Sequence, residues 1–118
     1  MKVLIVDDSE QFREAARLAC TELDSIDVIL SKDGYEALPA IKRHRPDLIL
    51  TDIDMPDLNG IKLTEIATSL DYQVVVMTGN ESPLDKALAG YGGAIGYIVK
   101  NEDFSNEIKR IVKAHSNG

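Results

Sequence analysis

The chain has 118 residues, of which 44% are hydrophobic and 28% are charged, and it carries a formal net charge of −7. This length suits one compact domain and excludes a second globular one, and no apolar run approaches the length needed to cross a bilayer. The acidic balance argues against direct binding of nucleic acid, because phosphate contacts require basic patches.

Five short apolar or β-branched runs alternate along the chain with segments of helical spacing. The first run stops after four residues at two aspartates, without the cleavage site of a signal peptide, so we expect a cytoplasmic protein with no membrane insertion. Apolar positions at helical spacing begin near Phe12, Ala37, Ile61, Leu84 and Phe104. The expected strands are Val3–Val6, Ile26–Leu30, Leu48–Leu50, Val74–Met77 and Ile95–Val99.

This alternation predicts an α/β fold. Strands that are apolar throughout are typical of a parallel sheet whose two faces are both covered by helices. Right-handed crossovers then favour a doubly wound, flavodoxin-like sheet of five parallel strands in the order 2-1-3-4-5, with five helices. The expected helix caps are Ser9, Asp33, Ser82 and Asp103. The single cysteine, Cys20, is expected to be a buried apolar residue on a helix.

Polar residues follow four of the five expected strands. Asp7 and Asp8 follow the first strand, Asp52 the third, Thr78 the fourth and Lys100 the fifth. Ligands of open parallel sheets bind beyond the carboxyl ends of the strands, where the strand order reverses, so we expect these side chains to converge on one crevice. Each residue alone has an ordinary explanation, as a helix cap or a solvated loop residue. Their joint occurrence at strand ends favours a functional site.

Three carboxylates in one crevice repel one another, and a hard divalent cation offsets that repulsion. We expect Mg²⁺, with Mn²⁺ as an alternative ion. Phosphoryl transfer requires mainly positioning and charge neutralisation, which such a site supplies. Asp52, on the middle strand, is the expected nucleophile, and Lys100 and Thr78 are suitable donors. His44 and His115 fall away from the crevice, and an aspartate of ordinary pKa needs no general base at neutral pH.

Four stretches resemble the CheY-like receiver domain of two-component response regulators. They are residues 3–8, 46–60, 74–79 and 93–100, of which 46–60 is the most specific. The resemblance covers essentially the whole chain and implies one receiver domain over residues 1–118, with no output domain in this chain. It also implies that Asp52 accepts a phosphoryl group from a sensor histidine kinase or a histidine phosphotransfer protein.

The resemblance further implies how the ion and the phosphoryl group are held. Asp8 and Asp52 would bind the ion directly, Asp7 would act through water, and Asp54 would contribute its backbone carbonyl. Lys100 would contact the phosphoryl group.

A switch is implied as well. Thr78 would move toward the phosphoryl group and Tyr97 would rotate inward, which would change the surface of the fourth helix, fifth strand and fifth helix. Asp54 and Asn80 would modulate dephosphorylation. Catalysis would be limited to self-catalysed phosphotransfer and autodephosphorylation, so the protein would be a regulator and not an enzyme.

Two departures from the family pattern affect the region near the fifth strand. Asn101 follows Lys100, where receiver domains commonly carry proline, often after a cis bond. A cis bond without proline is costly, which favours a trans bond here, but the sequence alone leaves the isomer open. The glycines of 90–93 predict a fourth helix that either ends early or is mobile.

Two other functions stay open. An aspartate-nucleophile phosphohydrolase similar to the haloacid dehalogenase group would also use Asp52, Asp54, Thr78 and Lys100, but here the acidic pair precedes these residues and the short chain leaves no room for a cap. A receiver-like module that is never phosphorylated would be expected to lack part of this set. The downstream target is unknown, and no residue argues for or against a phosphorylation-dependent dimer.

Overall fold

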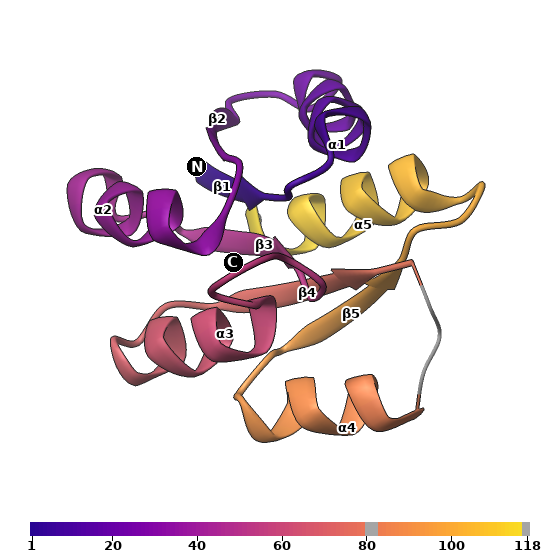
Figure 1. Cartoon of the computed structure of the whole chain (residues 1–118). Coiled ribbons are helices and arrows are strands. Elements are labelled where there is room, and N and C mark those ends of the chain that lie inside the picture. Colours follow the sequence, from indigo (N-terminus) through magenta and orange to yellow (C-terminus); the bar gives the residue numbers. More distant parts are fainter. Residues whose placement is uncertain (80–82, 117–118) are drawn as a thin grey trace.

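The computed structural model describes residues 1–79 and 83–116, in which strands and helices alternate (Figure 1). The strands are β1 (Lys2–Val6), β2 (Asp27–Ser31), β3 (Leu48–Asp52), β4 (Val74–Thr78) and β5 (Gly96–Val99). The helices are α1 (Glu10–Thr21), α2 (Gly34–His44), α3 (Gly60–Ser69), α4 (Pro83–Tyr91) and α5 (Phe104–Ser116).

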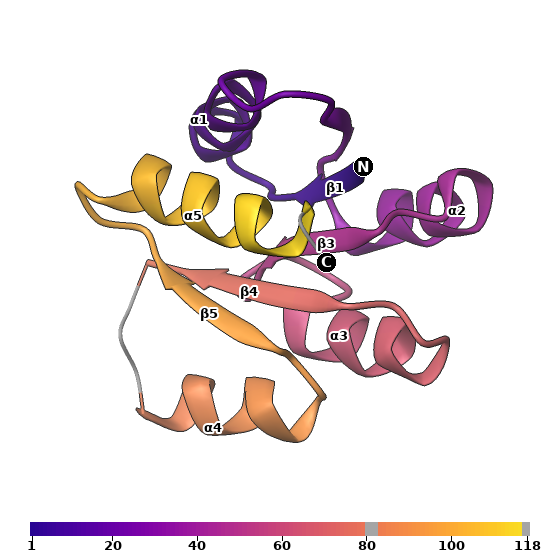
Figure 2. The ribbon, with the colours of Figure 1, turned by 180° about the vertical axis from the view of Figure 1, so that it is seen from behind.

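The five strands form one parallel sheet in the order β2-β1-β3-β4-β5, which confirms the predicted topology. Helices α1 and α5 lie side by side on one face, and α2, α3 and α4 cover the other (Figures 1 and 2). The chain therefore reverses its winding direction between β1 and β3, which leaves a crevice beyond their carboxyl ends.

The third strand is longer than its apolar run predicts. The run ends at Leu50, but the strand continues through Thr51 and Asp52, which pair with Val76 and Met77 of β4. A strand flanked on both sides keeps its ladder of hydrogen bonds through polar residues, because leaving those backbone groups unpaired would cost more. Asp52 is therefore held by the sheet itself.

Helix caps follow the sequence prediction at the first two helices. The side chain of Ser9 accepts a hydrogen bond from the backbone N–H of Phe12 at 3.4 Å, and that of Asp33 accepts one from Glu36 at 2.7 Å. The third helix has a cap that the sequence analysis missed, since Asn59 accepts from the N–H of Lys62 at 2.9 Å.

The second half of the chain agrees with the remaining expectations where it is described. Asp103 directly precedes α5, and its backbone carbonyl accepts from Glu107 at 2.9 Å. Ser82, the predicted cap of α4, lies outside the described residues. Helix α4 ends at Tyr91, as the glycine-rich stretch predicts, and the bond between Lys100 and Asn101 is trans.

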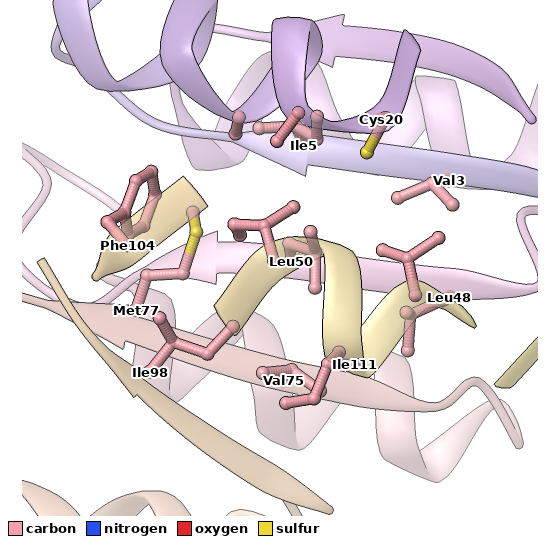
Figure 3. Close-up of a cluster of buried hydrophobic side chains, with 14 residues drawn as sticks. Val3, Ile5, Cys20, Leu48, Leu50, Val75, Met77, Ile98, Phe104 and Ile111 are labelled. Atoms are coloured by element: carbon pink, nitrogen blue, oxygen red, sulfur yellow. The ribbon is translucent and has the colours of Figure 1, made fainter. Parts of the chain in front are cut away.

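Three apolar clusters pack against the sheet, one on the face of α1 and α5 and two on the opposite face, and successive residues of β4 alternate between the two faces. The largest cluster lies under α1 and α5 (Figure 3). It includes Cys20, which is buried on α1 as predicted, and burial raises the pKa of its thiol to about 11. All ten residues of β3 and β4 are buried, so these strands form the centre of the core.

In the described part of the chain, no helix has the length and apolar character needed to span a bilayer.

Candidate functional site

The carboxyl ends of β1 and β3 bring three acidic side chains together. Asp7 and Asp8 follow β1, and Asp52 is the last residue of β3. Each offers one carboxylate oxygen, and these oxygens all lie within 4.8 Å of one another. Asp7 is fully buried and Asp52 is 5% exposed, whereas Asp8 faces solvent. The cluster thus has a buried floor and one side open to solvent.

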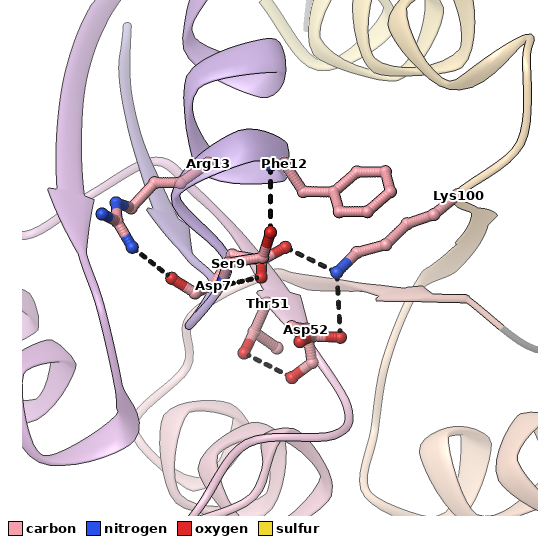
Figure 4. Close-up of polar contacts among 7 residues, drawn as sticks. All are labelled: Asp7, Ser9, Phe12, Arg13, Thr51, Asp52 and Lys100. Carbon is pink, nitrogen blue, oxygen red and sulfur yellow. Dashed lines mark hydrogen bonds and ion pairs between the residues drawn. The ribbon is translucent and has the colours of Figure 1, made fainter.

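Lys100, which follows the edge strand β5, points its side chain toward Asp7 and Asp52 (Figure 4). Its Nζ lies 2.7 Å from Asp7 Oδ2 and 3.2 Å from Asp52 Oδ1, and its side chain is only 6% exposed. One ammonium therefore serves two buried carboxylates, and Asp8 adds a third negative group nearby. When all three acids are ionised, the positive charge of Lys100 alone is too small to neutralise them.

This excess of negative charge affects the pKa of Asp52. Burial and the neighbouring Asp7 carboxylate raise the pKa of Asp52 to about 7, although Lys100 acts in the opposite direction. The ordinary aspartate pKa assumed in the sequence analysis therefore does not hold here. At neutral pH the site favours either a proton on Asp52 or an additional cation.

The raised pKa predicts that Asp52 destabilises the ion-free fold at neutral pH. The folded state holds the Asp52 proton more tightly than the unfolded chain, so this group's contribution to stability falls as pH rises from 3.8 to about 7. We expect Asp52→Asn to raise the thermal midpoint at about pH 7.5 by several degrees, and by less at about pH 4.5. Thermal unfolding in EDTA measures this, and equal midpoints at the higher pH would contradict it.

Backbone contacts fix the position of Asp7. Its Oδ1 accepts a hydrogen bond from the N–H of Ser9 at 2.9 Å, and its backbone carbonyl accepts one from Arg13 Nη1 at 2.8 Å. Its Oδ2 is buried, and its one described partner is the Lys100 ammonium. Asp7 thus presents one oxygen to the cluster in a fixed orientation.

The loop after Asp52 is tied down at both ends. The N–H of Ile53 donates to the carbonyl of Met77 at 3.0 Å, and the N–H of Gly60 donates to the carbonyl of Ile53 at 2.9 Å. A Cβ atom on Gly60 would lie 1.8 Å from the carbonyl oxygen of Asp52. Only glycine allows α3 to begin this close to β3, a role that the sequence analysis missed.

We expect Gly60→Ala to lower the stability of the protein strongly. The clash is with backbone, which cannot rotate away, so either the Asp52 loop or α3 must shift, at a cost of about 3 kcal/mol or roughly 10 °C in thermal midpoint. Gly90→Ala is the matched control, since a Cβ there meets nothing within 4 Å. Similar thermal midpoints for the two variants would show that the close approach at Gly60 is not required.

Among the described residues, the other predicted site residues lie outside the cluster of three acids. Thr78 is buried at the end of β4, and its carbonyl accepts from the N–H of Lys100 at 2.7 Å. Tyr97 lies half-buried on β5, with Lys86 Nζ 5.2 Å from its ring centroid. The Asp54 side chain is exposed and is not one of the three clustered acids. Asn80 lies outside the described residues.

A hollow of about 530 Å³ opens beside the acids. It is bordered by Asp8, Ile53, Asp54, Met55, Pro56, Asn59 and Ile61. The solvent-facing member of the cluster, Asp8, therefore borders this hollow, whereas the Lys100 side chain does not line it.

One contact of Lys100 was missed by the sequence analysis. Its Nζ lies 4.5 Å from the ring centroid of Phe12, a residue that the sequence pattern marks only as an apolar position of a helix. No signal in the sequence relates these two residues, which are 88 positions apart.

Comparisons with known proteins agree with this geometry. The family model of the response regulator receiver domain matches residues 3–113. The transcriptional regulatory protein LnrK of Bacillus subtilis is 31% identical, over 100% of this chain and 55% of its own length. CseB of Streptomyces avermitilis is 33% identical, over 92% of this chain and 46% of its own length. The chain thus spans about half the length of these relatives.

Solved receiver structures superpose over nearly the whole chain. The receiver domain of NarL from Mycobacterium tuberculosis has a TM-score of 0.89 at 29% identity, covering 99% of this chain and 96% of that one. The chemotaxis protein CheY4 of Vibrio cholerae has a TM-score of 0.83 at 28% identity, covering 95% and 96%. Since sequence family, strand order and backbone all agree, the chain belongs to the receiver domains of two-component response regulators.

Proposed function

We propose that Asp52 is the phosphoacceptor of this receiver domain. The observation that carries the proposal is the position of Asp52 at the end of β3, a fully buried central strand. Its carboxylate contacts Lys100, and one of its oxygens lies within 4.8 Å of a carboxylate oxygen of Asp7 and of Asp8. In the transfer, a carboxylate oxygen of Asp52 forms a bond to phosphorus while the bond from phosphorus to the donor's histidine nitrogen breaks. The released imidazole then takes up a proton.

The acidic cluster fits a hard divalent cation such as Mg²⁺ or Mn²⁺. Its donors are all carboxylate oxygens, Lys100 neutralises them incompletely, and Asp8 leaves one side of the cluster open to solvent. We propose that Asp8 and Asp52 hold the ion directly, that Asp7 acts through water and that Asp54 contributes its backbone carbonyl. When bound, the ion supplies positive charge that offsets the charge of the phosphoryl oxygens.

Lys100 and Thr78 supply the other contacts in this proposal. Lys100 is already 3.2 Å from Asp52, so a small movement of its ammonium would pair it with a phosphoryl oxygen. Thr78 ends the neighbouring strand and would donate its hydroxyl. Tyr97 would then rotate inward and change the surface formed by α4, β5 and α5. Asp54 and Asn80 would modulate the loss of the phosphoryl group.

The partners follow from the same chemistry. A sensor histidine kinase or a histidine phosphotransfer protein would present its phosphohistidine through the hollow beside Asp8. A downstream target or output domain would read the surface of α4, β5 and α5, on which a phosphorylation-dependent dimer could also form. We place the protein in the cytoplasm, without membrane insertion. Its charge of −7 argues against direct contact with nucleic acid.

A small phosphodonor tests this function without the natural kinase. Acetyl phosphate or phosphoramidate with Mg²⁺ is expected to add one phosphoryl group per chain, measured by intact-protein mass spectrometry, and EDTA is expected to prevent the addition. Absence of labelling would favour a module that is never phosphorylated. Sustained hydrolysis of a phosphate ester over many turnovers would favour the phosphohydrolase instead.

A further inference from the structure

The Lys100 side chain must be extended to contact the acidic cluster. Lys100 follows β5 and Asp7 follows β1, and two strands lie between them in the sheet. Three interstrand spacings amount to about 14 Å. A lysine side chain is shorter than this distance, so Lys100 must be extended and the Asp7 side chain must reach toward it. A long side chain loses considerable conformational freedom when it is held extended. An additional attractive contact along this path would favour the extended position.

Phe12 provides such a contact. The Lys100 ammonium lies 4.5 Å from the centroid of the Phe12 ring, close enough for attraction between the cation and the electron-rich ring face (Figure 4). The lysine side chain is 6% exposed, so water competes weakly for the ammonium. The described contacts of this ammonium are thus Asp7, Asp52 and the ring.

The ring itself is held in a fixed orientation. The backbone N–H of Phe12 donates to the cap residue Ser9, which places it in the first turn of α1. Its ring meets that of Phe104 edge to face, with centroids 5.5 Å apart and planes at 84°. Phe104 is buried at the start of α5, beside α1 (Figure 1). The two helices therefore fix the ring that contacts Lys100.

We propose that Phe12 is a positioning residue that holds the Lys100 ammonium over Asp52, in reach of a phosphoryl group. This inference rests on the proposed function of Asp52 as phosphoacceptor. Without the ring face, the ammonium would leave the cluster more often for solvent. Phosphoryl transfer would then lose a preorganised positive charge, because each departure must be reversed before the charge on phosphorus can be stabilised.

Two variants of Phe12 separate the ring face from simple packing. Phe12→Leu keeps an apolar side chain but removes the ring, and Phe12→Tyr keeps the ring face. We expect the limiting rate of phosphoryl incorporation from acetyl phosphate with Mg²⁺ to fall about 10-fold in Phe12→Leu and to stay within about 2-fold of wild type in Phe12→Tyr. The donor concentration at half-maximal rate should change little, since in this proposal Phe12 acts only through Lys100.

Leu23→Ala controls for lost stability. Leu23 packs against the same apolar cluster but has no described contact with Lys100, so its variant should lose stability while keeping the wild-type rate. The position of the lysine is read independently by NMR. The ring current of Phe12 should shift the ε-methylene protons of Lys100 upfield in wild type and Phe12→Tyr, and this shift should disappear in Phe12→Leu.

The outcomes separate the two proposals. If wild type takes up phosphate at Asp52 and Phe12→Leu does so at the same rate, the positioning role is wrong and the phosphoacceptor stands. An equal fall in rate for Leu23→Ala, or an unshifted Lys100 signal in wild type, also overturns the positioning role. If wild type takes up no phosphate, the phosphoacceptor assignment fails and the role of Phe12 fails with it.

Discussion

Asp52→Asn is expected to abolish phosphoryl incorporation from acetyl phosphate, with a loss of at least about 100-fold in rate. Asparagine has the shape of aspartate, but its amide oxygen is a much weaker nucleophile than a carboxylate oxygen. The surrounding strand should keep its structure, because the backbone of residue 52 is held in the ladder with β4. Intact-protein mass spectrometry, followed by peptide mapping of the labelled wild type, measures both the extent and the position of the modification.

Asp54→Asn is the matched control for this experiment. Asp54 lies on the same loop, two residues away, but its side chain is exposed and outside the acidic cluster. The control should accept one phosphoryl group per chain, although the stability of the product can differ. Equal labelling of Asp52→Asn and wild type would move the phosphoacceptor to another residue and would reject the central assignment.

Asp8→Ala is expected to weaken Mg²⁺ binding by at least about 10-fold, because even partners of metal ligands contribute that much to affinity. Asp8 is the solvent-facing member of the cluster, so its loss should disturb the fold less than loss of buried Asp7. Since an ion that binds only the folded state stabilises it, the thermal midpoint can be followed as Mg²⁺ is added. In wild type the midpoint should rise at lower Mg²⁺ concentrations than in Asp8→Ala.

The control for Mg²⁺ binding is Asp54→Ala. This variant removes an exposed negative charge near the site but leaves the backbone carbonyl, so its affinity should change by less than about 3-fold. If both variants shift the titration equally, the effect is general electrostatics and Asp8 is not a ligand. An unchanged titration for Asp8→Ala would likewise remove Asp8 from the proposed ion site.

The fold could be predicted from the sequence because its signals are local. Apolar runs such as Val74–Met77 have the length of a strand, and residues such as Ser9 and Asp33 cap the helices that follow them. The topology then follows from general rules of chain connection. The errors arose where neighbours override local composition, as in the extension of β3 through Thr51 and Asp52.

The site was predictable to the extent that it depends on strand ends. The meeting of Asp7, Asp8, Asp52 and Lys100 follows from strand order, because each residue ends or follows a known strand. The raised pKa of Asp52 could not be predicted in this way, since it depends on burial and on the distance to other charges.

Contacts between elements that are far apart in the chain could not be predicted from the sequence either. The Phe12 ring beside Lys100 depends on how α1 packs against α5. The short distance between Gly60 and the Asp52 carbonyl depends on the path of the intervening loop. Neither leaves a pattern of spacing or composition in the sequence.

The loop over residues 53–59 couples the binding of other molecules to the position of the phosphoacceptor. It is anchored by the hydrogen bonds of Ile53 and Gly60, and Gly60 leaves no free space against the Asp52 carbonyl. A protein that binds the exposed part of this loop would therefore displace the backbone of Asp52 without entering the acidic crevice. By thermodynamic reciprocity, a modification of Asp52 that shifts this backbone would change the affinity of that protein for the loop.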